Sequence, residues 1–564
     1  MTSASKERIF NAKFPEGERV LFVCCAGAVW CTSLPARAWC AGVEKGHGME
    51  RSGPSPGAVN LSAKMRFLPE HAGPHGSMKL TLLHAVQHLL VSSVALFAGL
   101  MPIAPASAQA ALPAPLREAL VSAGISPGAV GLYVHEVGAA QPLLEHNADR
   151  SMNPASVMKL LTTLAGLELL GPNYTWRTEA WIDGTLSGEV LQGNLVLKGY
   201  GDPKLTIEDL WLFLRELRAR GLREIRGDLV LDRSFFAVEP IDPGQFDNDP
   251  TRAYNVGPDA LLLNYKSVRL QFVPQEDSGT VRILPLPDLP QVSIVNQLAL
   301  GGGNCDFWPE RPQAIPEQAR LVFTGVFPRG CGEKAKSFSL LGPNEYALAL
   351  FQQLWREVGG SFSGRVRDGV VPESAKLLAT WDSPPLAQVI RDINKFSNNV
   401  MARQLFLTLA LAADNPPVST DKAARAMREW LVRSRLDFPE VQLENGSGLS
   451  RNERISPRHL GELLLYAARS PLMPEYVSSL PIPGVDGTLR RRLAGSPAIG
   501  RAHLKTGYLE GVRAIAGYVV DSRGRMLVVV SLINHPQAMG AQSFQEAVVE
   551  WVSSRAPAGT CCAR

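Results

Sequence analysis

The sequence predicts an α/β (α+β) core that is built from both ends of the folded chain and interrupted by a β-rich insertion. Apolar residues alternate from Gly131 onward, which is typical of a strand, and a hairpin pattern spans 514–533 near the other end. After Pro154 the apolar residues recur with helical spacing, whereas 181–335 consists of short apolar runs broken by Gly, Pro and Asp. At 564 residues the chain is too long for one ordinary core, so several domains are expected.

The first 110 residues are expected to lie outside this fold. Segment 78–110 resembles a secretory signal peptide, because its apolar centre, 89–104, is too short to span a membrane and Ala-x-Ala cleavage patterns precede Ala111. A buried apolar helix is the alternative. A functional signal peptide lies at the N-terminus, but residues 1–77 precede this one. We therefore interpret residues 1–77 as the result of a misplaced translation start and expect translation to begin at Met78. The expected location is therefore the periplasm, after cleavage of the signal peptide.

The elements follow in chain order. The strand from Gly131 has a return strand within 141–147, and an apolar stripe over 157–170 predicts a helix that Gly171-Pro172 ends. One helix, 207–220, interrupts the β-rich block. The later helices are expected at 343–355, 387–411, 422–433 and 457–468, and a last helix at 543–551 follows the hairpin. The expected domains are a first core part at 111–180, the insertion at 181–335, a second core part at 336–556 and a tail at 557–564.

Charge and cysteine content narrow the function. The net charge of +4 comes without any basic run interleaved with aromatic residues, so a nucleic-acid partner is not indicated. The cysteines and histidines show no metal-ligand spacing, and neither a metal nor an organic cofactor is implied. Cys305 and Cys331 both fall in the insertion, and we predict a disulfide between them because an exported chain meets an oxidising compartment. No pairing is predicted for Cys561 and Cys562.

Three short motifs carry the candidate chemistry: S-x-x-K, S-x-N and a single K-[ST]-G at Lys505. The first two each occur three times, so neither is specific alone. Among the S-x-x-K serines, Ser3 lies in the doubtful extension and Ser419 in a loop, whereas Ser156 begins a long amphipathic helix. The S-x-N motifs begin at Ser151, Ser397 and Ser450.

The helical context gives Ser156 a chemical role. A serine hydroxyl is a weak nucleophile and needs a base, and Lys159 lies one turn later on the same helix face. A lysine acts as a base only if its pKa is depressed, which burial and the positive charge of Lys505 would do. The helix N-terminus also favours developing negative charge. The alternative is an N-cap serine beside a solvated lysine.

Taken together, these motifs resemble the low-molecular-mass class C penicillin-binding proteins, the D-alanyl-D-alanine carboxypeptidase/endopeptidase family. The resemblance covers about 115–555, and the long gaps between the motifs are similar to that family rather than to a β-lactamase. It implies a transpeptidase-like domain, an antiparallel sheet between helices, with added β-rich domains. The segments that carry it are 153–159, 397–399, 505–507, 201–205, 446–450 and 484–489.

The resemblance also implies a role for each site residue. Ser156 would attack the penultimate D-Ala carbonyl with Lys159 as its base, and Ser397 would pass the proton to the leaving amine. Asn399 would hold the substrate amide, and Lys505 with Thr506 would bind the terminal carboxylate. Gly507 and Tyr508 would continue an edge strand, and the N–H groups of Ser156 and Tyr508 would bind the oxyanion.

Two positions depart from the family pattern. Asn445 stands where the family often has Asp, and Tyr508 stands where a small hydroxyl residue is common after Lys-Thr-Gly. The Tyr508 side chain would either shape substrate choice in the cleft or pack outward on the strand, and side-chain alternation leaves both interpretations open.

The expected function is that of a serine DD-peptidase acting on peptidoglycan stem peptides, with β-lactam antibiotics as covalent inhibitors. The alternatives are a catalytically silent wall-binding protein and a β-lactamase or esterase that uses the same serine. The sequence leaves open the preference for carboxypeptidase or endopeptidase cleavage, and also a homo-oligomer.

Overall fold

The computed structural model describes residues 9–13, 19–23 and 112–555, apart from 309, 311, 316 and 317. It divides into two units, 1–102 and 103–564. In the first unit, β1 (Ile9–Lys13) pairs antiparallel with β2 (Arg19–Val23). The predicted signal peptide, 78–110, and the predicted tail, 557–564, lie outside the described residues.

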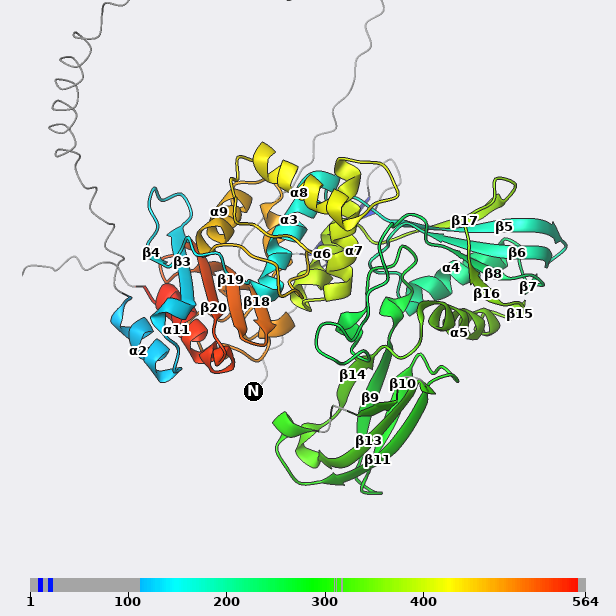
Figure 1. Cartoon of the computed structure of the whole chain (residues 1–564), viewed down its shortest axis with the longest axis horizontal. Coiled ribbons are helices and arrows are strands. Elements are labelled where there is room, and N and C mark those ends of the chain that lie inside the picture. Colours follow the sequence, from blue (N-terminus) through cyan, green and yellow to red (C-terminus); the bar gives the residue numbers. More distant parts are fainter. Residues whose placement is uncertain are drawn as a thin grey trace, which may run out of the picture. The chain divides into compact units, whose positions relative to one another are not determined.

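A five-stranded antiparallel sheet forms the centre of the second unit, in the order β18-β19-β20-β3-β4. The pairing of β3 with β20 places the early and late parts of the chain side by side (Figure 1). This confirms the predicted core from both ends, its early strand and its late hairpin. The bounds are β3 Val130–Glu136, β4 Leu144–His146, β18 Ala502–Leu509, β19 Val512–Val520 and β20 Met526–Asn534.

Helices cover both faces of this sheet, because side chains along β20 alternate between two apolar cores. One core includes α3 (Lys159–Leu170) and α9 (Pro457–Ala467), and the other includes α2 (Ala114–Ser122) and α11 (Gln542–Ser553). Full burial of each such side chain contributes about 1.5–3 kcal/mol. On β20 the first set is Val528, Val530 and Leu532, and the second is Leu527, Val529 and Ile533.

The helical region between the insertion and β18 holds one break that the sequence analysis missed. The single helix predicted over 387–411 is two helices, α6 (Leu386–Lys395) and α7 (Asn399–Thr408). Ser397 lies between them with a φ of 56°, a left-handed conformation that stops a helix and is rare for a residue with a side chain. The other helices are α8 Thr420–Arg433 and α10 Met473–Ser478. None of the helices within the described part of the chain is long and apolar enough to cross a membrane.

The insertion contains two further sheets that share one apolar core with α4 (Ile207–Ala219) and α5 (Pro343–Glu357). The first sheet takes β15, β16 and β17 from beyond residue 335 and pairs them with β5, β7 and β8. The boundary predicted between 335 and 336 therefore falls inside this core, whose last strand ends at Asp382. The strands of this first sheet are β5 Arg177–Ser187, β6 Val190–Gly199, β7 Glu224–Ile225, β8 Leu229–Asp232, β15 Ser361–Phe362, β16 Val366–Asp368 and β17 Lys376–Asp382.

The second inserted sheet has six strands in the order β12-β13-β11-β10-β9-β14. Their bounds are β9 Val268–Gln275, β10 Thr280–Leu286, β11 Ser293–Gly301, β12 Gln313–Ile315, β13 Arg320–Pro328 and β14 Lys334–Phe338.

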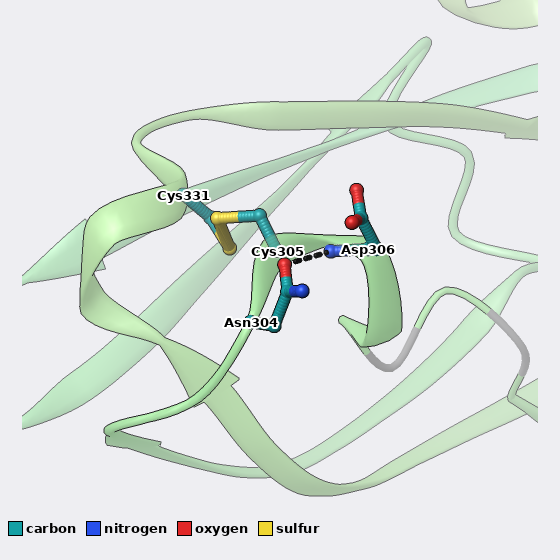
Figure 2. Close-up of a disulfide and its surroundings, with 4 residues drawn as sticks. All are labelled: Asn304, Cys305, Asp306 and Cys331. Carbon is teal, nitrogen blue, oxygen red and sulfur yellow. Dashed lines mark hydrogen bonds between the residues drawn. A yellow bond between two sulfur atoms is a disulfide. The ribbon is translucent and has the colours of Figure 1, made fainter.

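The predicted disulfide links the turns that follow two neighbouring strands of this sheet. β11 and β13 run parallel, and Cys305 and Cys331 lie in the short turns that follow them. Their sulfur atoms are bonded, with the Cα atoms 5.2 Å apart (Figure 2). Beside the bond, the Asn304 side chain accepts a hydrogen bond from the Asp306 N–H at 3.0 Å and caps the first turn. The prediction from the sequence is confirmed.

Replacing both cysteines by serine is expected to destabilise this sheet. The bond closes a loop with a sequence separation of 26 residues, and losing such a cross-link costs about 3 kcal/mol in the loop-entropy model. The midpoint of thermal unfolding should be lower for Cys305→Ser/Cys331→Ser than for the wild type. A reductant should lower the midpoint of the wild type and leave that of the double variant unchanged. Free thiols at both positions in a non-reducing peptide map would contradict the pairing.

Candidate active site

Ser156 lies in a 3₁₀ turn, Ala155–Met158, that leads directly into α3. The preceding residue, Ala155, has a φ of 46°, so the chain bends sharply at the point where the serine is presented. Asn153 fixes this bend, because its side chain accepts from the Ala155 N–H at 2.8 Å and donates to the Ser450 carbonyl at 2.9 Å. The turn is thus tied to a distant loop before any substrate arrives.

The Lys159 amine lies 2.9 Å from the Ser156 hydroxyl oxygen. Lys159 is fully buried and also donates to the Asn399 side-chain oxygen at 2.6 Å and to the Ser447 carbonyl. These contacts hold the amine over the serine, as the one-turn spacing predicts. Ser156 itself remains partly accessible.

A second buried lysine lies across the site. The Lys505 amine donates to the Ser397 hydroxyl at 2.8 Å and to the Thr506 carbonyl at 2.8 Å. It comes from β18, the edge strand of the central sheet, whereas Ser397 comes from the break between α6 and α7. The left-handed backbone at Ser397 therefore turns its hydroxyl toward the K-T-G strand.

Two glycines let the surrounding segments approach the serine turn. A Cβ at Gly448 would lie 1.9 Å from the Ala155 carbonyl oxygen, and one at Gly507 would lie 2.7 Å from the Pro154 carbonyl oxygen. Both positions therefore require glycine, and Gly507 faces the turn that carries Ser156.

Glu453 organises the loop that contacts Lys159, and the sequence analysis missed it. Its fully buried carboxylate accepts four backbone N–H bonds, among them those of Gly446 at 2.7 Å and Gly448 at 2.8 Å. Asn445 shapes the same loop by accepting from the Ser447 N–H at 2.9 Å, so the amide completes this turn where the family often has Asp. A lone Glu outside the three motifs gave no signal of this role.

The charges around Lys159 act in opposite directions. Burial and then the charge of Lys505 hold the pKa of Lys159 well below its usual range, with a smaller contribution from Arg403, whereas Glu453 raises it. Burial lowers the pKa of Lys505 to about 7. Burial also raises the pKa of Glu453 against the effect of its backbone N–H bonds. The predicted effect of Lys505 on Lys159 is thus present.

The Tyr508 side chain packs against residues other than those of the serine turn. Side chains alternate along β18, so Tyr508 lies on the opposite face from Gly507. Its hydroxyl contacts the Met539 sulfur, and the Arg513 guanidinium lies 5.3 Å from its ring centre. The side chain is 52% exposed. Of the two interpretations left open by the sequence, this geometry favours outward packing.

The structure thus brings together Ser156, Lys159, Asn399, Lys505 and Ser397, from three distant parts of the sequence. Gly507 lies against the serine turn, and the Thr506 hydroxyl points to Thr488, 2.8 Å away. Among the described residues, no three metal-ligating side chains gather in one place.

Comparison with known proteins agrees with this geometry. Residues 113–555 match the D-Ala-D-Ala carboxypeptidase 3 (S13) family. The chain belongs to this family. It is accordingly a serine D-Ala-D-Ala carboxypeptidase.

Several relatives of this S13 peptidase are aligned with it over most of their length. The D-alanyl-D-alanine carboxypeptidase DacB of Haemophilus influenzae is 28% identical over 407 residues, which cover 72% of this chain and 85% of the relative. The D-alanyl-D-alanine carboxypeptidase of an Actinomadura species is 28% identical over 463 residues, which cover 77% of this chain and 83% of the relative. The crystal structure of penicillin binding protein 4 from H. influenzae is 26% identical, with a TM-score of 0.64 over 78% of this chain and 99% of that one. Its α/β transpeptidase fold with inserted β-rich domains is the fold predicted from the sequence.

The two lysines predict a bell-shaped pH dependence for acylation by penicillin. Lys159 must be neutral, so the rate rises as the pH passes its depressed pKa. Lys505 must be charged to attract a carboxylate, so the rate falls as the pH rises through about 7. In Lys505→Gln the pKa of Lys159 rises, and the acidic limb should move to higher pH while the basic limb disappears.

Lys505→Arg is the matched control for this profile, because arginine keeps the charge at every pH. It should keep the acidic limb near the wild-type position and remove the basic limb. The measurement is the second-order rate of acylation across the pH range. An acidic limb at the same pH in Lys505→Gln as in the wild type would contradict the coupling between the two lysines.

Proposed function

We propose that this S13 peptidase cleaves the terminal D-Ala-D-Ala bond of peptidoglycan stem peptides through an acyl-enzyme on Ser156. The observation that carries the proposal is the 2.9 Å contact between the Lys159 amine and the Ser156 hydroxyl. The amine is buried and its pKa is depressed, so it can accept the serine proton near neutral pH.

The first step forms the acyl-enzyme. The Ser156 oxygen bonds to the penultimate D-Ala carbonyl carbon as its proton moves to Lys159, and the carbonyl becomes an oxyanion. The N–H groups of Ser156 and Tyr508 are the proposed oxyanion donors, and losing one such donor typically costs about 3 kcal/mol of transition-state stabilisation. The outward direction of the Tyr508 side chain does not affect its N–H, because any residue other than proline provides one.

The second step releases the leaving group. The proton passes from Lys159 through Ser397 to the departing amine, as the C–N bond breaks. Ser397 suits this role because its hydroxyl already contacts Lys505, and Asn399 links the S-x-N segment to Lys159. Water then attacks the ester carbonyl carbon and gives a proton to Lys159. The C–O bond to Ser156 breaks as Lys159 returns that proton to the serine oxygen.

Substrate recognition is proposed in two regions near Ser156. Lys505 and Thr506 hold the terminal carboxylate, and Asn399 helps to hold the substrate amide. A cavity of about 410 Å³ is lined by residues of the loop after Gly448 and by an insertion loop that contains Phe246. Two residues of its lining, Leu449 and Phe246, pack in one apolar cluster with Ala155, the residue before the serine. This space supports binding of the rest of the stem peptide.

Binding of β-lactams is part of the same proposal. The H. influenzae penicillin binding protein 4 has been solved in complex with a β-lactam; that structure is 25% identical to this chain, with a TM-score of 0.61. A β-lactam carries an amide carbonyl next to a carboxylate-bearing ring. Ser156 would attack this carbonyl and Lys505 would attract the carboxylate, as proposed for the peptide.

Mass spectrometry after incubation with penicillin tests Ser156. The adduct should appear on the peptide that contains Ser156 and be lost in Ser156→Ala, with Ser419→Ala as the control that retains it. Labelling that persists in Ser156→Ala would refute the assignment. Absence of any adduct in the wild type would favour a silent wall-binding protein, and rapid turnover of a chromogenic β-lactam would favour a β-lactamase.

We also propose that the chain is exported to the periplasm, where its substrate lies. The support is the signal-like segment 78–110 together with the disulfide between Cys305 and Cys331, which suits an oxidising compartment. N-terminal sequencing of protein from the native periplasm should give a start near Gln109 or Ala111. Peptides from residues 1–77 in that material would contradict a translation start at Met78.

A further inference from the structure

The segment Gly484-Val-Asp-Gly-Thr-Leu489 is held against the Ser397 side of the site, yet the proposed mechanism does not use it. The Asp486 carboxylate accepts from the buried Lys395 amine at 2.7 Å, and Lys395 ends α6 two residues before Ser397. Gly487 approaches closely, since a Cβ there would lie 2.6 Å from the Lys395 carbonyl oxygen. The turn is therefore fixed from this side.

On its other side the same turn reaches the K-T-G strand. The Thr488 hydroxyl oxygen lies 2.8 Å from the Thr506 hydroxyl oxygen. The Thr506 carbonyl in turn accepts from the Lys505 amine, which also donates to Ser397. Thr488 thus lies next to the groups that are proposed to bind the terminal carboxylate, and it is exposed to solvent.

Tyr508 does not supply a hydroxyl at this place. Thr506 and Tyr508 share one face of β18, but the Tyr508 hydroxyl contacts the Met539 sulfur. The hydroxyl that neighbours Thr506 is that of Thr488.

We propose that Thr488 is a substrate-binding residue whose hydroxyl, together with that of Thr506, donates a hydrogen bond to the terminal carboxylate of the substrate. The inference rests on the proposed function. Each hydroxyl has one hydrogen, so in the free enzyme one of the pair donates to the other. A carboxylate has two acceptor oxygens, and both hydroxyls can then donate to it beside the charge of Lys505.

This arrangement selects for a free carboxylate at the end of the substrate. A terminal carboxamide has one acceptor oxygen and an NH₂ group that can only donate. It cannot offer a separate acceptor oxygen to each hydroxyl, and because it is neutral it forms no ion pair with Lys505. Thr488 therefore contributes to the preference for the acid over the amide, and this preference is what an experiment can measure.

The test compares Thr488→Val with the wild type on diacetyl-L-lysyl-D-alanyl-D-alanine and on the same peptide ending in a carboxamide. For the acid, kcat/KM should fall by about 10- to 100-fold, as expected for a lost hydrogen bond to a charged group. For the amide, kcat/KM should change by less than about threefold, so the preference for the acid shrinks. Thr488→Ser, which keeps the hydroxyl, should retain the preference, and Thr185→Val on exposed β5 is the control for the substitution itself.

Three results would overturn the inference: an unchanged kcat/KM for the acid in Thr488→Val, an equal loss on both peptides, or a loss in Thr488→Ser as large as in Thr488→Val. If Thr488→Val does not fold, Thr488→Ala is measured in its place with the same criteria. Failure of the proposed function is distinct, because the wild type would then neither hydrolyse the acid peptide nor form a penicillin adduct on Ser156.

Discussion

The chemistry of the site rests on two lysine amines, those of Lys159 and Lys505, that are buried close to each other. Neither Lys159 nor Lys505 forms an ion pair with a carboxylate among the described residues, and both are fully buried. Desolvation penalises the charged form of each, and the charge of Lys505 further lowers the pKa of Lys159. One lysine can then serve as a base while the other keeps enough charge to attract an anion.

The surrounding fold supplies oxygen acceptors that hold these amines without neutralising them. The Lys159 amine donates hydrogen bonds to the Asn399 side chain and the Ser447 carbonyl. The Lys505 amine donates to the Ser397 hydroxyl and the Thr506 carbonyl. Neutral acceptors satisfy the N–H groups, whereas a carboxylate at the same distance would restore the usual lysine pKa. The nearby carboxylate of Glu453 instead accepts backbone N–H bonds, and its own pKa is raised by burial.

This arrangement also opposes folding at neutral pH. A lysine whose pKa is lower in the folded state binds fewer protons there than in the unfolded chain. For Lys505 the difference extends from its folded pKa of about 7 to its unfolded value, near 10.4. Its contribution to stability is therefore least favourable below that window and improves as the pH rises through it. The apolar packing of the two faces of the central sheet offsets such a cost, so the site depends on a large core.

How far the sequence predicts this site depends on whether each contact is local. Ser156 and Lys159 are one helical turn apart, so their contact follows from helix geometry, and the alternation from Gly131 and over 514–533 fixes the strands that build the central sheet. Glu453 could not be predicted, because it acts by accepting N–H bonds from a loop whose conformation no motif encodes. The break at Ser397 was missed for a similar reason. The apolar pattern of 387–411 continues through it, and only contacts with β18 show why the backbone turns there.

The end of the insertion shows the same limit at the level of domains. Residues 343–357 have an ordinary helical pattern, which does not say which core they join. In the fold, α5 packs with β5 to β8 in one core, and β17 pairs with β5 from far along the sequence, as Lys376 does with Ile182, and so becomes an edge of that sheet. The return strand that completes a sheet is a tertiary requirement. The chain must therefore finish the inserted core at Asp382 before α6 can carry it back to the site, where Lys395 and Ser397 end the helix beside Lys505.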